Sequence, residues 1–381
     1  GGQVTITLPG SPSAGNIVAV SDYNNTAVTN AHIINRNGNK INGDTSNVEI
    51  SKNGTAIELV YVDATTGWQA VATSNTIDVQ NPFIVATGGT ISISGDFKIH
   101  TFTGPGTFSV TNAGAPSGST TVDYLVVAGG GSGGGRYGGG GGGGGFRESS
   151  GAASGCYTRS PLGACVSALP VSVQSYPIVV GGGAAGVPAV PGSDDGNRGN
   201  PSSFSTITST GGGAGAGQAA NSPLGPGGSG GGGSYGPTSP VAAGGSGNTP
   251  PVSPPQGSNG GSGHVPNSPY ATGGGGGATE VGANSSGSNA GRGGAGATSC
   301  ITGSPVGRSG GGGGSGEGAH GVTAGGASPC GSGTAGASSN TNSSNGSDNR
   351  GGGSGAAYYP GPSSSSGTGG SGIVVIRYKF Q

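Results

Sequence analysis

Residues 124–146 read Tyr-Leu-Val-Val-Ala-Gly-Gly-Gly-Ser-Gly-Gly-Gly-Arg-Tyr, then eight consecutive glycines and Phe146. A strand-like apolar run therefore passes directly into glycine tracts, and further tracts follow at 211–217, 273–277 and 310–314. A glycine inside an α-helix costs about 1 kcal/mol relative to alanine, so these tracts exclude a helical fold. Eight glycines in a row also break the Gly-X-Y period that collagen requires.

The whole chain has the same character, because 95 of its 381 residues are glycine and 25 are proline. Hydrophobic residues make up only 30%, which is too little for one core running through the entire chain. The net charge of −1 indicates no nucleic-acid partner and no anionic membrane surface. No run approaches the ~18 apolar residues of a membrane-spanning helix. We therefore expect neither nucleic-acid binding nor membrane insertion.

Two interpretations of the glycine tracts remain. One is a flexible Gly/Ser linker. The other is a lattice of left-handed extended helices of the polyproline II type, with three residues per turn and a rise of about 3.1 Å. Buried peptide groups need partners, and only glycine lets such helices approach closely enough to bond backbone to backbone. Because strands at 122–128 and 373–380 can anchor a lattice, we favour it and expect Gly141→Val to disrupt the domain.

Residues 1–128 have the composition of ordinary β-structure, with Val, Ile and Thr alternating with polar residues. The candidate strands are 4–8, 16–21, 32–36, 48–52, 57–62, 68–72, 91–94, 98–103, 107–111 and 122–128. Period-two alternation predicts one buried face in the first module, made of Val4, Ile6, Val18, Val20, Leu59 and Tyr61.

These patterns predict an all-β fold with an irregular glycine-rich region. We expect a β module over 1–80 and a second β segment over 81–128. A glycine-rich domain follows over 129–381, packed as polyglycine II-type helices and closed by the strand 373–380. We also expect the chain to be the C-terminal part of a longer protein.

The sequence offers no enzymatic constellation. No lysine follows a glycine, so a Walker A loop is absent, and no helix is expected after the glycines to complete a dinucleotide site. Asp194-Asp195 is interpreted as a loop pair rather than a glycosidase dyad. Metal-ligand spacing is lacking at the four histidines, which are His32, His100, His264 and His320. We expect no enzymatic activity, no catalytic residue, no cofactor and no metal, with His100 a structural residue of its strand.

The cysteines are Cys156, Cys165, Cys300 and Cys330, and none belongs to a Cys-x-x-Cys motif. Four cysteines allow three disulfide pairings. A bridge between Cys156 and Cys165 makes the least demand on topology, and four free thiols are the alternative.

Several segments carry a resemblance to a known family. They are Ile99-His-Thr-Phe-Thr-Gly-Pro-Gly-Thr-Phe-Ser-Val110, Asp123-Tyr-Leu-Val-Val-Ala-Gly-Gly-Gly131, Tyr176-Pro-Ile-Val-Val-Gly-Gly-Gly183, Ser203-Phe-Ser-Thr-Ile-Thr-Ser-Thr-Gly-Gly-Gly213 and Gly372-Ile-Val-Val-Ile-Arg-Tyr378. Over residues 90–381 the chain resembles the glycine-rich C-terminal domain of bacteriophage tail fibres, and it is similar in principle to phage tip adhesins with polyglycine helices. Residues 3–72 resemble a β module that recurs in tail fibres.

The resemblance implies a receptor-binding protein that attaches the virion to its bacterial host. Its partners would be a host cell-surface glycan or outer-membrane protein and other tail proteins, with the fibre located on the virion and outside cells. The resembling fibres are trimeric, and a module of ~70 residues buries little surface alone, so we expect a homotrimer. The alternative is a structural filament or decoration (head-fibre) protein without receptor binding.

Tyrosines in the polar segments are the candidate receptor-binding residues, because tyrosine offers a large contact area and a hydrogen-bonding tip. They are Tyr157, Tyr235, Tyr270, Tyr358 and Tyr359. Tracts of similar length that run back and forth must place their connections at two ends. We therefore expect the segments 146–175, 234–272 and 356–366 to expose these rings together at the distal end.

Overall fold

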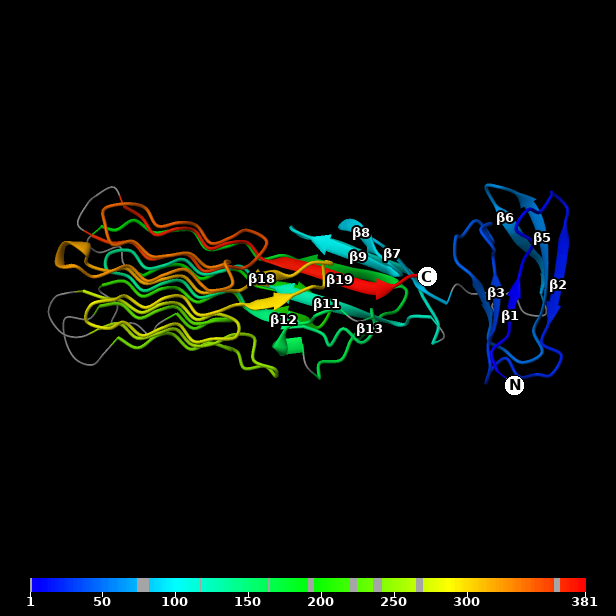
Figure 1. The fold of residues 1–381 in the computed structure, drawn as a ribbon, viewed down its shortest axis with the longest axis horizontal. Coiled ribbons are helices and arrows are strands. Elements are labelled where there is room, and N and C mark those ends of the chain that lie inside the picture. The colour runs from blue at the N-terminus through cyan, green and yellow to red at the C-terminus, as the bar shows by residue number, and fades with distance from the viewer. Residues whose placement is uncertain are drawn as a thin grey trace.

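The computed structural model describes residues 2–73, 82–116, 118–155, 157–163, 165–190, 195–218, 225–235, 242–264, 270–359 and 364–381. The fold is all-β, with 29% of residues in strands and 2% helical, and it includes a glycine-rich domain, which confirms the expected class. Figure 1 shows three parts along one long axis, namely an N-terminal β module, a pair of sheets and a bundle of extended tracts.

The N-terminal module contains two small sheets. One has the order β1-β3-β4 and the other the order β2-β5-β6. The strands are β1 (Thr5–Thr7), β2 (Ile17–Ser21), β3 (His32–Asn35), β4 (Val48–Ile50), β5 (Ala56–Asp63) and β6 (Gly67–Thr73). All six agree closely with the strands expected from alternation and turn residues.

The core of this module is apolar and centred on Trp68, whose ring lies edge-on to that of Tyr61. Leu59 and Tyr61 are buried as expected, and Val18 and Val20 pack against them. The prediction for Val4 is wrong, since its side chain is 49% exposed. Ile6 is only half-buried and lies outside the core, because β1 is a short edge strand paired only with β3.

Two larger sheets form the middle of the molecule. A six-stranded sheet has the order β12-β11-β19-β9-β8, with β13 beside β11, and a five-stranded sheet has the order β16-β15-β14-β10-β7. Their strands are β7 (Ile84–Thr87), β8 (Thr90–Ser94), β9 (Phe97–Phe102), β10 (Gly106–Ala113), β11 (Thr121–Val127), β12 (Phe146–Glu148), β13 (Leu169–Pro170), β14 (Gln174–Val179), β15 (Ser202–Phe204), β16 (Ile207–Ser209) and β19 (Ile373–Lys379). A separate hairpin, β17 (Ala297–Ser299) and β18 (Val306–Arg308), and two short 3-10 turns, η2 (Pro161–Gly163) and η3 (Gly318–His320), complete the elements.

The C-terminal strand β19 holds the middle of the molecule together. It pairs antiparallel with β11 on one side and with β9 on the other, so the sheet expected between 122–128 and 373–380 is present. Its side chains are buried from Ile373 to Tyr378, because sheet or lattice covers both faces. Strands on either side of residue 128 thus share one sheet, and this sheet supports the start of the tracts.

The tract 138–145 lies inside a lattice of extended tracts. Its N–H groups donate to three neighbouring tracts in rotation, with N···O distances of 2.7–3.0 Å. The donors are Gly139, Gly142 and Gly145 toward 210–216, Gly140 and Gly143 toward 273–276, and Gly141 and Gly144 toward 351–354. Its carbonyls accept from three further tracts, 128–134, 229–232 and 312–315. A helix with three residues per turn and six neighbours is polyglycine II packing.

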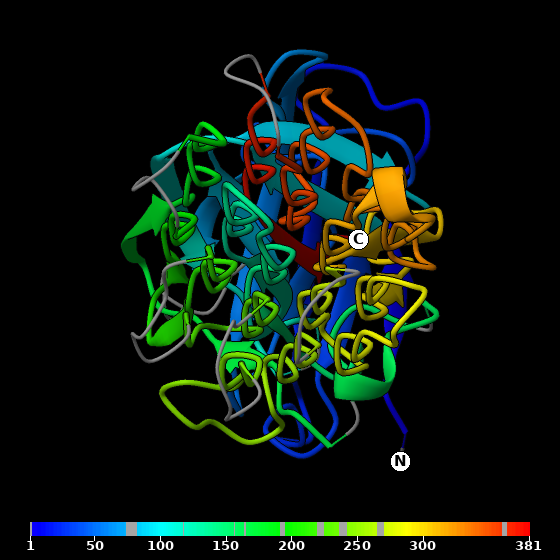
Figure 2. The same ribbon diagram turned by 90° about the vertical axis from the view of Figure 1, so that its left-hand side faces the viewer.

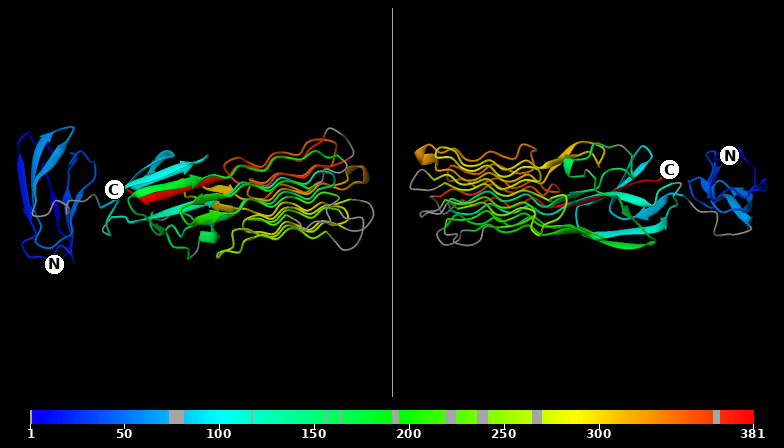
Figure 3. Two further views of the ribbon diagram at one scale, coloured as in Figure 1. Left: turned by 180° about the vertical axis from the view of Figure 1, so that it is seen from behind. Right: turned by 90° about the horizontal axis from the view of Figure 1, so that it is seen from below.

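The lattice interpretation is therefore confirmed and the linker interpretation is wrong. None of the glycines at 138–145 has a φ between +20° and +160°, as expected for a left-handed extended helix. Seen end-on in Figure 2, the tracts appear as small three-cornered coils lying side by side. Figure 3 shows the same tracts running parallel to the long axis from the sheets to the far end.

Close approach explains why this packing requires glycine. A Cβ on Gly140 would lie 2.0 Å from the carbonyl oxygen of Gly312, and one on Gly141 would lie 2.2 Å from that of Gly131. Alanine could adopt the backbone angles of this tract, but there is no room for its Cβ between neighbouring tracts. Hydrogen bonds between tracts here take the place of an apolar core.

The tracts at the edge of the lattice need other hydrogen-bond acceptors, because they have no neighbouring tract on one side to accept from some of their N–H groups. Exposed side chains at Asn342, Asn345 and Asp348, three residues apart, lie along one edge. Their Oδ1 atoms accept from the backbone N–H groups of Ser365, Thr368 and Ser371 at 2.9, 2.9 and 3.1 Å. The three-residue spacing places all three side chains on the same face. We call this row the Asn/Asp ladder.

Candidate functional site at the distal end

The end of the lattice remote from the sheets is where successive tracts turn back. The turn at Arg136–Tyr137 joins the antiparallel tracts 128–134 and 138–145, whereas Phe146 at the other end enters β12. Figure 1 shows η3 at the same remote end, opposite the N-terminal module. We call this the distal end.

A cluster of tyrosines fills the distal end. Tyr137, Tyr235 and Tyr358 are buried together with Ala337, and Tyr270 and Tyr359 are half-buried against them. The ring centroids of Tyr137 lie 4.8 Å from Tyr270, 5.7 Å from Tyr358 and 6.0 Å from Tyr359. Tyr235 and Tyr270 are 4.1 Å apart. We call these five rings the tyrosine cluster.

Four of these rings lie at the distal end as expected, but the expected exposure is wrong for Tyr235 and Tyr358, while Tyr270 and Tyr359 are partly exposed. Tyr235 and Tyr358 are only 5% and 4% exposed, so they cannot present free rings to a receptor. The physical reason is that the tract ends leave space between diverging backbones, which large side chains fill. Tyr235, Tyr270 and Tyr359 are each adjacent in sequence to a segment outside the described residues (236–241, 265–269 and 360–363).

Tyr157 lies elsewhere, and its prediction is wrong. The guanidinium of Arg377, on β19, lies 5.4 Å from its ring centroid, and the ring packs beside Leu162 against the core under the six-stranded sheet. Segment 146–175 therefore lies at the sheet end of the lattice. Segment 234–272 reaches both ends, because the Phe146 N–H at the sheet end donates to the carbonyl of Gln256 at 2.9 Å.

Two residues of the distal end were missed at the sequence level. Arg136 is the only charged residue between Asp123 and Arg147, and with Tyr137 it interrupts an otherwise glycine-rich run. Tyr137 adopts φ +48°, a left-handed conformation that is costly for a bulky side chain. Glycine would adopt this conformation without cost and is abundant in this chain, so the contacts of the Tyr137 ring account for tyrosine at this position.

Arg136 lies against the tyrosine cluster. Its guanidinium carbon is 4.1 Å from the Tyr359 ring centroid and 5.7 Å from that of Tyr137, within the range of cation–π attraction. Its carbonyl accepts from the N–H of Gln218 at 3.1 Å. Its Nε atom is buried without a hydrogen-bond partner. No carboxylate pairs with Arg136 within the part of the chain that the structure describes.

Two described carboxylates lie at the distal end, Glu317 and Asp195, and Asp195 accepts from the N–H of Gly217 at 2.9 Å beside the segment that bonds the Arg136 carbonyl. Glu317 lies against the tyrosine cluster. Its carboxylate accepts from the N–H of Tyr270 at 3.0 Å and lies 2.9 Å from Nδ1 of the exposed His320. Burial raises the pKa of the Tyr137 hydroxyl to about 12, with Tyr358 and Glu317 adding to the effect. The Tyr137 hydroxyl is therefore neutral at ordinary pH.

The other candidate residues are dispersed or structural. Cys165, Cys300 and Cys330 are free thiols, so a bridge to Cys165 is not present, and Cys156 lies outside the described residues, as does Asp194. His100 is buried, with Nδ1 2.7 Å from the carbonyl oxygen of Gly88 and Nε2 3.0 Å from the hydroxyl of Tyr378. Across the described ranges, no three His, Cys, Asp or Glu side chains gather as a metal site would need. Nor does any described helix have the length and apolar character to cross a bilayer.

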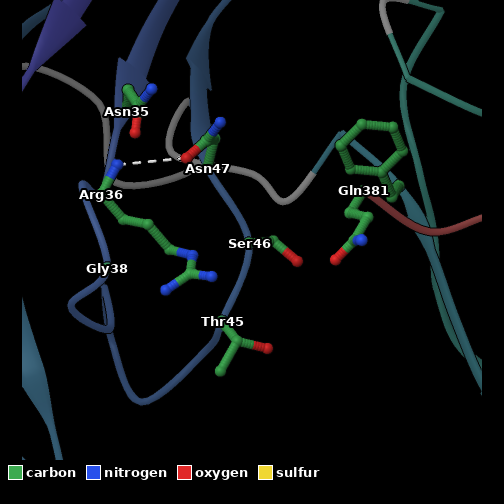
Figure 4. Close-up of a pocket in the computed structure, with 8 residues that line it drawn as sticks. Asn35, Arg36, Gly38, Thr45, Ser46, Asn47 and Gln381 are labelled. Atoms are coloured by element: carbon green, nitrogen blue, oxygen red, sulfur yellow. Dashed lines mark hydrogen bonds between the residues drawn. The ribbon is translucent and has the colours of Figure 1, made fainter. Parts of the chain in front are cut away.

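A cavity of about 260 Å³ lies between the N-terminal module and the C-terminus. Figure 4 shows Asn35, Arg36, Ser46 and Asn47 on the module side and Gln381 opposite. The guanidinium of Arg36 donates to the carbonyl of Asn39 at 3.0 Å, and the N–H of Arg36 donates to Asn47 at 3.1 Å. These polar groups satisfy one another, and the lining contains no acid–base pair.

The lattice and the sheets that carry it correspond to one family unit. A family model described as "Glycine-rich domain" matches residues 101–379. The chain belongs to this glycine-rich domain family. The match begins at the end of β9 and ends with β19, so the family unit contains β11, β12 and β19 of the six-stranded sheet as well as the glycine tracts, while β8 precedes it. No curated protein matches the chain.

Proposed function

We propose that this glycine-rich domain protein is the C-terminal portion of a bacteriophage tail fibre that attaches the virion to a bacterial host surface. One observation carries the proposal, which is the polarity of the molecule. The N-terminal module and both larger sheets lie toward one end, and the Arg136–Tyr137 turn and the tyrosine cluster lie at the other (Figure 1). A rigid scaffold that gathers chain connections at one end is a common architecture for recognition.

The partners follow from that polarity. The distal end would contact a host glycan or an outer-membrane protein, and the N-terminal side would join other tail proteins. The motifs that resemble tail fibres, such as Ile99–Val110 and Gly372–Tyr378, form β9, β10 and β19, which support the lattice. The polypeptide would work outside cells as part of the virion.

We also propose that the protein assembles as a homotrimer through its N-terminal module. The outward face of the β2-β5-β6 sheet exposes apolar side chains at Ile17 (61%), Val62 (40%) and Val71 (55%). Burial of such a face between copies would be favourable. Light scattering should give three times the 35.2 kDa chain mass, and the mass of a single chain or of a dimer would refute the trimer.

Site-directed blocking of the distal end tests the attachment function. An azide-bearing residue would replace Ala319, exposed in η3 at the distal end, or Val281, exposed near the sheet end, and each would be coupled to polyethylene glycol. The labelled full chain would then be incubated with a panel of bacterial isolates and counted by flow cytometry. We expect the adduct at Ala319 to block adsorption and the adduct at Val281 to leave it intact. The reverse pattern would place the attachment surface at the sheet end and refute the distal site, whereas a chain that adsorbs to no isolate would favour a structural filament.

A further inference from the structure

Arg136 occupies the turn that joins the central pair of tracts, so its position is set by the lattice rather than by a mobile loop. The N–H groups of Gly131 and Gly134 donate to Gly142 and Gly139 at 2.9 Å each, which fixes both arms of the hairpin. The bond from the Gln218 N–H fixes the Arg136 carbonyl. A cation held this way is oriented before any ligand arrives, and this reduces the entropic cost of binding.

The guanidinium lies against two tyrosine rings, and among the described residues no side-chain hydrogen bond from it is present. Its two ring contacts, to Tyr359 and Tyr137, satisfy the flat faces of the group but none of its five N–H donors. The Nε–H is buried and unpartnered. Both described carboxylates of the distal end are engaged elsewhere: Glu317 by Tyr270 and His320, and Asp195 by the N–H of Gly217 at 2.9 Å. An arginine stacked in this manner matches the planar, two-pronged acceptor geometry of a carboxylate or a phosphate.

We propose that Arg136 binds a carboxylate or phosphate group on an acidic saccharide at the distal end. Its surroundings favour a sugar over an acidic peptide. The half-buried ring of Tyr359 lies against the cation and that of Tyr270 lies against Tyr137, and both provide apolar surface for a sugar ring. Ser339 and Asn340, which are exposed and follow Ala337 of the same cluster by two and three residues, are uncharged and can hydrogen-bond to sugar hydroxyls. The inference rests on the proposed function, because it names the ligand class of the same end.

Binding of defined saccharides to the full chain tests the inference. The probes are an oligogalacturonate, which carries carboxylates, a glycerol-phosphate-substituted oligosaccharide, a neutral maltooligosaccharide and oligoglutamate. The variants are Arg136→Met, Arg136→Lys and, as a matched control, Arg198→Met, which removes an exposed arginine from another tract. Calorimetry gives the affinities, and thermal unfolding of each variant shows that the fold is retained.

We expect one or both anionic saccharides to bind and the neutral one to bind far more weakly. Arg136→Met should reduce anionic affinity by at least about tenfold, since hydrogen bonds to charged groups are worth about 1.5–3 kcal/mol. The affinity of Arg136→Lys should lie between those of the wild type and Arg136→Met, because lysine keeps the positive charge but lacks the planar, two-pronged donor group of arginine. Arg198→Met should bind like the wild type. The relative affinities for carboxylate and phosphate then identify which anion the site accepts.

Three outcomes would overturn the inference. They are absence of anionic saccharide binding by the wild type, anionic binding that Arg136→Met leaves unchanged, and oligoglutamate binding as tight as the saccharides. If Arg136→Met unfolds, the affinity of Arg136→Lys and the salt dependence of wild-type binding test the inference instead. Wild-type binding that is insensitive to salt would refute a charge contact. Adsorption to cells without acidic saccharide binding would leave the attachment function standing, whereas saccharide binding without adsorption to any isolate would reject that function alone.

Discussion

Replacement of Gly141 by alanine tests whether close backbone approach holds the glycine-rich domain together. The added Cβ would lie 2.2 Å from the carbonyl oxygen of Gly131 and 2.7 Å from the carbonyl carbon of Ser132. Ordinary contacts begin near about 3.4 Å, so the tract 128–134 would have to move by more than about 1 Å. That tract donates three hydrogen bonds to 138–145, at 2.9–3.0 Å, and a shift of this size breaks them.

Three lost bonds at about 1 kcal/mol net each give about 3 kcal/mol, and the loss is larger where buried donors find no new partner. Gly182→Ala is the matched control, because Gly182 also lies in a tract but its added Cβ would meet only Asn200 Nδ2 at 3.7 Å. That variant should be neutral or more stable by up to about 1 kcal/mol, since alanine restricts the unfolded chain. Equilibrium denaturation followed by circular dichroism measures both. If Gly141→Ala loses less than about 1 kcal/mol, or no more than Gly182→Ala, close packing is not what stabilises the lattice.

Three further predictions concern side chains. Asn345→Leu should lower the stability of the lattice by about 1 kcal/mol in chemical denaturation, because the Thr368 N–H loses its acceptor, whereas Asn340→Leu should not. Burial lowers the pKa of His100 below its ordinary value of 6.5, so the unfolded chain binds the proton first and the stability of the fold should decrease as the pH drops below about 6.5. His100→Gln should remove this decrease from a plot of melting temperature against pH, and an unchanged plot would contradict the prediction. Burial alone would raise the pKa of Asp22, but hydrogen bonds from the N–H groups of Thr26, Ala27 and Gly54 and from the ring of His32 lower it to about 2. The stability that this carboxylate contributes above about pH 4 should therefore be lost toward pH 2, and Asp22→Asn should remove this pH dependence in an acid-unfolding experiment.

The N-terminal strands could be read from the sequence because local rules act strongly there. Alternation between apolar and polar residues and the Asn-Gly and Pro-Gly turns place β1 to β6 within a residue or two. The misplacement of Val4 shows the limit of this reasoning, since alternation identifies two faces of a strand but not whether an edge strand has anything to cover it. Its 49% exposure depends on the partner sheet, which alternation cannot locate.

The distal end shows a sharper limit. The sequence could indicate that connections such as 234–235 and 358–359 gather at one end, because tracts of equal length must turn there. It could not show that Tyr235 and Tyr358 become buried among other rings, since that depends on the spacing of tracts that are remote in sequence. Arg136 carried one available signal, its isolation as the only charge in a long glycine-rich run.

The sequence by itself determined that the glycine-rich region lacks helices and a large apolar core, and that its peptide groups must bond to one another. These conclusions follow from composition and from the close approach that only glycine permits. Tertiary structure alone decided which tracts are neighbours, since every glycine tract offers the same backbone groups and no side chain to distinguish them. That choice depends on the anchors, namely the pairing of β19 with β11 and β9 and the Asn/Asp ladder at the edge. The neighbours of each glycine tract are therefore specified by the residues that are not glycine.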